Sequence, residues 1–110
     1  MGAYLVALIE YSGEEPHWAN TAYLPTFQRL LEKYGGARTA AAPIEQVEGL
    51  PFDETVAAIF EFPNAAAAHS FWNDPEYRAV VPLRQSKGRF QIFILPGNEE
   101  SPWSPPEPTT

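Results

Sequence analysis

Two glutamates near the ends of apolar segments are the side chains most suited to chemistry in this sequence. Glu10 follows the run YLVALI, and Glu61 interrupts VAAIFEF two residues before Pro63. A carboxylate at the end of a buried strand can bind a small polar ligand, or it can stay protonated and serve in acid–base chemistry. The first question is therefore which other polar groups would lie beside this pair.

Three more polar residues are predicted to join the two glutamates at one end of a sheet. The strands that carry Glu10 and Glu61 are predicted to be parallel neighbours, so their carboxyl ends should lie together. The start of the last strand then brings Arg89 and Gln91 to that end, and the start of the second strand brings Arg38. Such a cluster predicts a ligand-binding pole, although a structural salt bridge that satisfies two buried carboxylates is the simpler interpretation.

Histidines and helical aromatic residues are weaker candidates. His69 and Trp72 fall in one predicted helix, and His17 lies at the start of another. A lone histidine on a helix is more often a satisfied surface group than a base or a ligand, and aromatic residues at helical spacing usually pack in a core. His69 and Trp72 nevertheless remain candidate ligand-binding residues.

Composition and missing motifs exclude several classes of function. The chain has 110 residues, a net charge of −7 and only seven Lys and Arg, so it lacks the basic clusters that bind nucleic acid. It contains no cysteine, which excludes disulfides and thiolate chemistry. The sequence has no phosphate-binding glycine loop, no HExxH, no GxSxG and no metal-ligand spacing. We therefore expect no cofactor and no metal.

The longest N-terminal apolar run does not indicate a membrane protein. Tyr4–Ile9 has no basic flank before it and is too short to span a bilayer. We therefore expect no membrane partner and a cytoplasmic location.

Four segments are predicted to form the sheet that positions the polar residues. Ala3–Tyr11, Val56–Phe62 and Arg89–Leu95 are largely apolar at both parities, which is typical of strands covered on both faces. Residues 37–48 have little β-propensity and contain Pro43, which a sheet tolerates only at its edge. They are predicted to form an irregular edge strand.

An apolar stripe predicts the first helix. It should begin near Pro16, kink at Pro25 and stop at Gly35, where glycine allows the left-handed conformation. The apolar residues recur at helical spacing, and they are Tyr23, Phe27, Leu30, Leu31 and Tyr34.

A second helix is predicted in two pieces, over residues 65–72 and 77–84. Asn64 is suited to cap the first piece, and Asp74 is suited to cap the second just before a proline. Pro82 should bend or shorten the second piece.

The order of elements predicts an α+β fold of the ferredoxin-like type, βαββαβ, with a four-stranded antiparallel sheet and two helices on one face. The domain should span residues 1–97, and the proline-rich tail 98–110 should contribute little to the core. Because the strands are apolar on both faces, the face without helices needs a cover. A second copy of the chain can supply it, so we expect a homodimer.

Several segments resemble one known family. They are YLVALIEY, the helix end EKYGG, VAAIFEFPNAAAAHSFWNDPEYRAVVPLR and GRFQIFILPG. Together they are similar to the domain-of-unknown-function family thirteen-thirty, small bacterial members of the dimeric α/β-barrel superfamily. The resemblance covers residues 3–97 and implies two ferredoxin-like protomers that meet sheet to sheet in a barrel. The family has no agreed activity, so the resemblance implies no catalytic residues.

Three functions follow as hypotheses. The first is a homodimeric protein that binds a small molecule between sheet and helices or inside the dimer barrel. The second is an enzyme without a metal, of the monooxygenase or isomerase kind that the superfamily resemblance implies. The third is a structural or interaction module in which the segment Pro102–Pro108 binds a partner as an extended polyproline segment. A ligand-sized pocket would favour the first two hypotheses, whereas a filled interior would favour the third.

Overall fold

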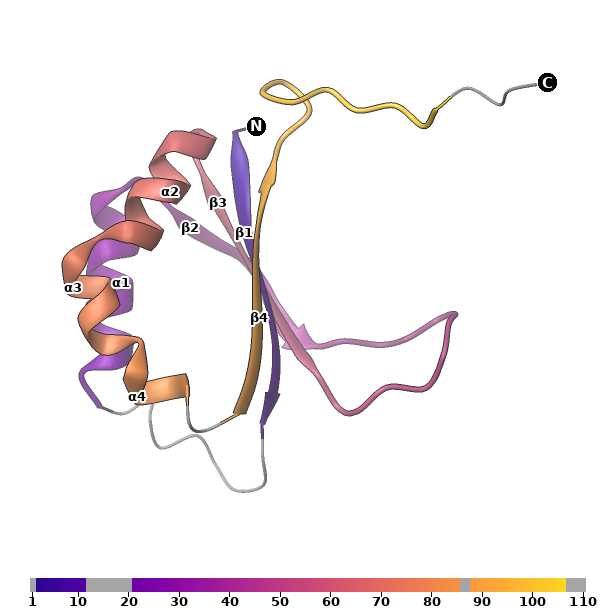
Figure 1. The fold of residues 1–110 in the computed structure, drawn as a ribbon, viewed down its shortest axis with the longest axis horizontal. Coiled ribbons are helices and arrows are strands. Elements are labelled where there is room, and N and C mark those ends of the chain that lie inside the picture. Colours follow the sequence, from indigo (N-terminus) through magenta and orange to yellow (C-terminus); the bar gives the residue numbers. More distant parts are fainter. Residues whose placement is uncertain (1, 12–20, 86–87, 107–110) are drawn as a thin grey trace.

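A four-stranded antiparallel sheet carries helices on one face (Figure 1). The computed structural model describes residues 2–11, 21–85 and 88–106. The predicted βαββαβ order is confirmed, with the second helical segment divided into three pieces. The elements are β1 (Ala3–Tyr11), α1 (Tyr23–Lys33), β2 (Ala37–Pro43), β3 (Val56–Phe62), α2 (Ala65–Asn73), α3 (Pro75–Val80), α4 (Pro82–Gln85) and β4 (Gly88–Pro96).

The strand order is β2-β3-β1-β4, and β1 runs antiparallel to both of its neighbours. The prediction that β1 and β3 are parallel is wrong. The crossover through α1 brings β2 back in the direction of β1, and the chain then reverses to form β3 against β2. As a result Glu61 lies opposite Tyr4, while Glu10 lies opposite Arg89 at the other end of β1.

The two faces of the sheet have different surroundings. On β1 the alternate residues Ala3, Leu5 and Ala7 are buried under the helices, whereas the residues between them are only partly covered. We call the face without helices the open face. On β1, β3 and β4 the apolar residues of the open face are Tyr4, Val6, Leu8, Ala57, Ile59, Phe93 and Leu95.

Helix α1 ends in a hydrogen-bonded glycine turn. Gly35 has a φ of 76°, and the backbone N–H groups of Gly35 and Gly36 donate to the carbonyls of Glu32 and Leu31. The predicted stop is therefore confirmed. Pro25 lies in the first turn of the helix, where its missing N–H would have had no helical acceptor, so it does not occupy the interior position that the predicted kink requires. The predicted start near Pro16 lies outside the described residues.

The caps predicted for the second helical segment are present. The Asn64 side chain accepts a hydrogen bond from the backbone N–H of Ala67 at 2.7 Å. The Asp74 side chain accepts one from the backbone N–H of Glu76 at 2.8 Å. Pro82 ends α3 and begins α4, as its ring geometry predicts.

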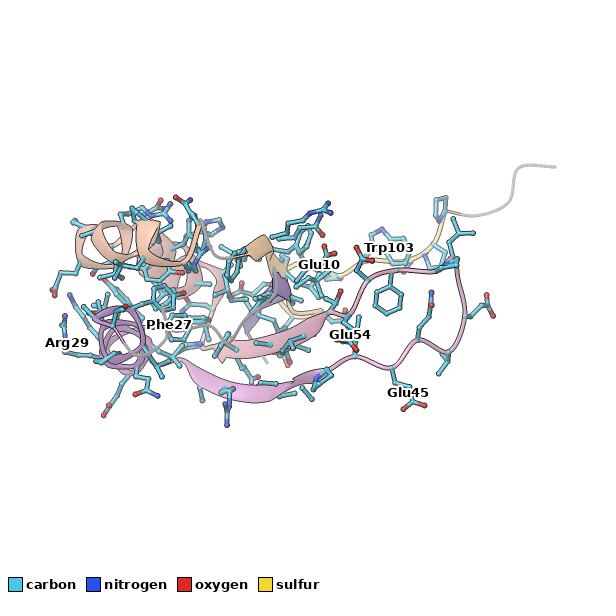
Figure 2. The ribbon with its side chains drawn as sticks, turned by 90° about the horizontal axis from the view of Figure 1, so that it is seen from below. Glu10, Phe27, Arg29, Glu45, Glu54 and Trp103 are labelled. Atoms are coloured by element: carbon cyan, nitrogen blue, oxygen red, sulfur yellow. The ribbon has the colours of Figure 1, made fainter. Side chains whose placement is uncertain are left out.

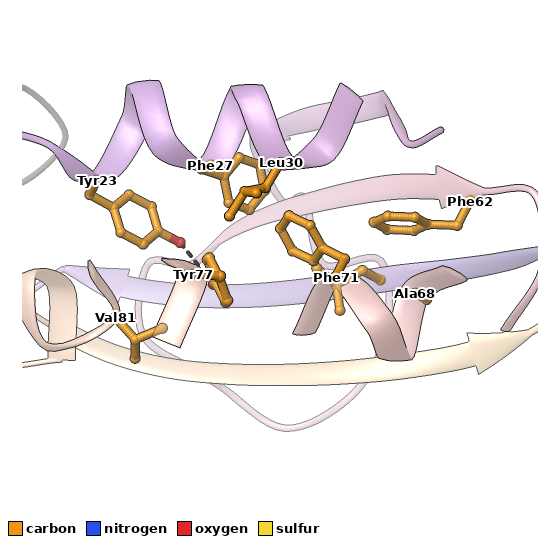
Figure 3. Close-up of a cluster of buried hydrophobic side chains, with 9 residues drawn as sticks. Tyr23, Phe27, Leu30, Phe62, Ala68, Phe71, Tyr77 and Val81 are labelled. Atoms are coloured by element: carbon orange, nitrogen blue, oxygen red, sulfur yellow. Dashed lines mark hydrogen bonds between the residues drawn. The ribbon is translucent and has the colours of Figure 1, made fainter. Parts of the chain in front are cut away.

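The core lies between the sheet and the helices and is rich in aromatic rings (Figure 3). Phe71 is fully buried, and its ring centroid lies 4.8 Å from that of Tyr77 and 5.2 Å from that of Phe27. These edge-on and tilted contacts join α1, α2 and α3 into one layer over the sheet.

Two extended segments project from this layered body. The first, which we call the arm, comprises residues 44–55 between β2 and β3, and the second is the tail after β4 (Figure 1). The predicted edge strand reaches only Pro43, so residues 44–48 belong to the arm. The radius of gyration is 15.9 Å, compared with the roughly 13 Å of a compact domain of this length. The arm exposes 92% of Val47 and 86% of Leu50.

Candidate ligand-binding site

A cavity of about 130 Å³ lies between the sheet and the helices. Its wall is almost entirely apolar, and Arg84 is the one charged residue among the described residues that form it. The wall combines side chains from β1, α1, β3, α3, α4 and β4. They are Leu5, Ala7, Ile9, Tyr23, Leu24, Phe27, Ala58, Phe60, Tyr77, Arg84, Phe90 and Ile92.

Arg84 is buried beside two tyrosines. Only 4% of the residue is exposed. Its Nε donates a hydrogen bond to the Tyr23 hydroxyl at 3.2 Å, and its Nη2 donates one to the Tyr77 hydroxyl at 3.3 Å. The two hydroxyls are themselves joined at 3.1 Å (Figure 3). Arg84 follows Tyr77 by seven residues, which is two helical turns, so the restart at Pro82 keeps both side chains on the inner side.

Aromatic faces, rather than a carboxylate, surround the guanidinium. Its carbon lies 4.9 Å from the Phe90 ring centroid, 5.8 Å from that of Tyr23 and 6.0 Å from that of Trp72. Rings at these distances attract a cation through their electron-rich faces. The ion pairs between residues that the structure describes do not include Arg84. The cavity therefore contains a positive charge without an acidic counter-ion from those residues.

Burial and neighbouring groups determine the protonation of Tyr23 and Arg84, which with Tyr77 form one corner of the cavity. Burial, followed by the neighbouring Tyr77, raises the pKa of Tyr23 far above its ordinary value, so its hydroxyl keeps its proton at neutral pH. Burial lowers the pKa of the Arg84 guanidinium, but Tyr77 and Tyr23 outweigh it and raise that pKa overall. The corner thus combines a permanent cation with hydroxyl donors.

The predicted polar pole is divided between two ends of the sheet. Glu10 and Glu61 do lie on the open face together, but Glu61 lies opposite Tyr4, and the six residue steps from Tyr4 to Glu10 separate the two glutamates by about 20 Å along β1. The expectation that they share one end is therefore wrong, because it assumed parallel strands. Arg89 does reach Glu10, with its Nε 3.8 Å from Oε2, and the side chain of Arg89 is exposed whereas that of Glu10 is half-buried. Figure 2 labels Glu10.

The remaining predicted residues are also dispersed. Gln91 lies opposite Leu8, and Arg38 lies opposite Phe60 on the edge strand. His69 is exposed on α2, away from the residues that line the cavity. Trp72 is the candidate that borders the cavity cluster, because its ring lies near the guanidinium of Arg84.

The sequence pattern does not single out the residues that define the cavity. It places Tyr23 in an apolar stripe, and it gives no role in a site to Tyr77 or Arg84. One signal was present, namely the seven-residue spacing that places Tyr77 and Arg84 on one side of a helical segment. That spacing alone does not reveal that α1 supplies Tyr23 to the same point.

The described residues provide neither a metal site nor a membrane-spanning helix. No group of three His, Asp or Glu residues within the ranges described above is arranged to hold a metal ion. No helix in those ranges is long and apolar enough to cross a membrane.

The order of strands and the single helical layer define the chain as a ferredoxin-like α+β domain. The chain belongs to the family described as Domain of unknown function (DUF1330), whose family model matches residues 2–98. The predicted resemblance is thus confirmed. No curated protein matches the chain.

Two solved structures share this fold, and a third is less similar. The methylated RPA0582 protein is 20% identical with a TM-score of 0.62, over 86% of this chain and 79% of that chain. The RPA0582 protein of unknown function from Rhodopseudomonas palustris is 21% identical with a TM-score of 0.60, over 84% of this chain and 79% of that chain. A structure described as an antibiotic biosynthesis monooxygenase is 19% identical with a TM-score of 0.47, over 84% of this chain and 95% of that chain. At these identities the likeness concerns the fold alone.

Proposed function

We propose that the protein is a homodimeric small-molecule-binding protein whose ligand occupies the cavity between sheet and helices. The observation that carries this proposal is the buried guanidinium of Arg84, which lies beside two tyrosine hydroxyls on a largely apolar cavity wall. Apolar pockets with a few convergent polar groups are the usual form of small-molecule sites. A buried charge lowers stability unless it is compensated, so its presence here supports a role in binding.

The cavity volume limits the size of the ligand. Sites for drug-sized ligands measure about 300–1,000 Å³, whereas an apolar cavity of about 150 Å³ in another protein accommodates benzene. A volume near 130 Å³ therefore suits a ligand with one small ring or a short branched chain.

A binding role fits the cavity better than the enzyme hypothesis. Proton transfer at neutral pH needs a group that can accept a proton, and carboxylates and histidines usually supply it. The described residues on the cavity wall include neither. The raised pKa of Tyr23 also keeps that hydroxyl protonated at neutral pH, so it supplies no phenolate to accept a proton.

Benzene can serve as a neutral probe of the cavity. We expect it to raise the melting temperature of the wild-type protein progressively as its concentration increases, as a ligand of the folded state does. Ala58→Leu fills the cavity and should abolish this response, whereas Ala66→Leu, at an exposed position on α2, should preserve it. No response in the wild type, or equal responses in both variants, would overturn the proposal.

The proposed self-association rests on the open face. Phe93 and Leu95 expose 51% and 56% of their surface there, on a strand that also lines the cavity from its other side. A two-fold partner presents the same apolar surface, so two copies can cover each other. Sedimentation at micromolar concentration should therefore give about twice the chain mass of 12.3 kDa, and a monomer would contradict this part of the proposal.

A further inference from the structure

We infer that the ligand of this cavity is a small monocarboxylate, with its carboxylate on Arg84 and an apolar body against the sheet. The inference rests on the proposed function, because it specifies the chemistry of the same site.

Arg84 has more hydrogen-bond donors than the protein uses. A guanidinium carries five N–H groups and accepts no hydrogen bond. Two of the five donate to Tyr23 and Tyr77. The other three have no acceptor among the described residues, although only 4% of Arg84 is exposed to solvent. A buried donor without an acceptor destabilises the folded state, so a ligand that brings acceptors has a direct energetic advantage.

The charge of the site selects an anion. Aromatic faces and phenol hydroxyls stabilise the guanidinium only in part, and attraction between opposite charges is stronger in largely apolar surroundings than in water. A carboxylate matches the planar fork of arginine with two parallel hydrogen bonds. A phosphate dianion fits less well, because a single cation faces it and the hydroxyls of Tyr23 and Tyr77 are already hydrogen-bonded to each other and to Arg84.

The apolar part of the cavity wall determines what the uncharged part of the ligand can be. Leu5, Ile92 and Phe27 offer only apolar contacts to anything that extends from Arg84 toward the sheet. With about 130 Å³ in total, the cavity accommodates a body of roughly one ring or a short branched chain. Benzoate and a branched short-chain acid have this size and this division into one charged end and one apolar end.

Calorimetric titration of the wild-type protein with benzoate and benzamide tests the inference directly. The two molecules have nearly the same shape, but benzamide is neutral and brings its own N–H donors toward the donors of Arg84. We expect benzoate to bind at least about 10-fold more tightly, as a charged hydrogen-bond pair does. If benzene binds but benzoate binds no more tightly than benzamide, this inference is wrong while the proposed function stands. If none of the three binds, the proposed function has failed.

Variants then assign the preference to one residue. Arg84→Met should remove the preference for benzoate over benzamide while benzene still binds, whereas Arg78→Met, at an exposed arginine over Trp72, should retain it. A purely structural role for Arg84 would lower stability without changing the ratio of the two affinities, and an unchanged ratio in Arg84→Met would overturn the inference. If that variant does not fold, the wild-type comparison decides.

Discussion

At the scale of single residues, Asp74 shows how one carboxylate joins two elements. Its Oδ1 accepts from the first turn of α3, while its Oδ2 accepts from the Tyr34 hydroxyl at 2.6 Å and lies 3.5 Å from Lys33 Nζ near the end of α1. The hydrogen bond from Tyr34 lowers the pKa of Asp74 below its ordinary value, and the backbone of Glu76 and the charge of Lys33 act in the same direction against the effect of burial. The carboxylate form is therefore the one that the fold stabilises.

The lowered pKa of Asp74 gives a prediction for Asp74→Asn. Asparagine still caps α3 but has no charge, so at pH 6 the variant should melt about 5 °C below the wild type. Because the pKa of Asp74 is lower in the folded state, the wild-type advantage is fully present well above pH 3.8, the ordinary value, and is lost as the pH falls through the folded value. Circular dichroism melts between pH 3 and pH 6 measure it. Asp53→Asn, in the exposed arm, is the control, and a difference independent of pH would contradict the assignment.

The residue scale also separates what the sequence predicts from what it does not. The caps at Asn64 and Asp74 were predictable, because each acts on backbone groups only two or three residues away. The role of Arg84 was not, because its hydrogen bond to Tyr23 spans 61 residues and depends on how α1 packs. Local hydrogen-bonding chemistry is visible in a sequence, whereas a corner built from several elements is visible only after they are placed.

At the scale of elements, Gly35 determines how α1 joins β2. Its φ of 76° is accessible to glycine without strain, whereas a side chain there meets its own backbone. The turn then places the next residue so close to Leu31 and Phe62 that it too is a glycine. The helix thereby passes directly into the edge strand.

We therefore expect Gly35→Ala to destabilise the protein by about 1 kcal/mol, measured by urea unfolding. Gly35→Asn should be less costly than Gly35→Ala, because asparagine adopts the left-handed conformation more readily. Equal stability of Gly35→Ala and the wild type would show that the turn does not depend on this backbone conformation.

The direction of β3 was the main error at this scale. Apolar patterns predicted where the strands lie, but a pattern of period two does not encode strand direction. The direction follows from connectivity, since a helical crossover preserves it and the arm reverses it. Together these two connections make β3 antiparallel to β1, so Glu61 and Glu10 lie at opposite ends of the sheet.

At the scale of the whole molecule, the open face and the arm mark surfaces that a single copy leaves exposed. A helical layer covers one side of the sheet, and the described residues on the other side include Phe93 and Leu95 at the surface. The sequence predicted this asymmetry correctly, because its strands are apolar at both parities while only two helical segments are available to cover them. It did not predict the length of the arm, which lacks a periodic pattern.

Phe93→Asp should convert the proposed dimer into a monomer. Phe93 lies opposite Val6 on the open face, so a charge there would be buried without a partner in a sheet-to-sheet interface. Leu83→Asp places the same charge on an exposed residue of α4, on the helical side, and should leave the dimer intact. Sedimentation velocity distinguishes the two species. A dimer that survives Phe93→Asp would move the interface away from the open face.

The central place of β1 in the sheet also affects the order in which the fold forms during synthesis. β1 is the first strand to be synthesised, but both of its neighbours, β3 and β4, come from later parts of the chain. Contacts between distant parts of a chain form slowly, because a long loop must close before they stabilise anything. The cavity is delayed further, since Phe90 and Ile92 on β4 complete its wall. During translation the apolar residues of β1 therefore remain unpaired until β3 has left the ribosome, and the cavity, which also needs β4, is among the last features to form.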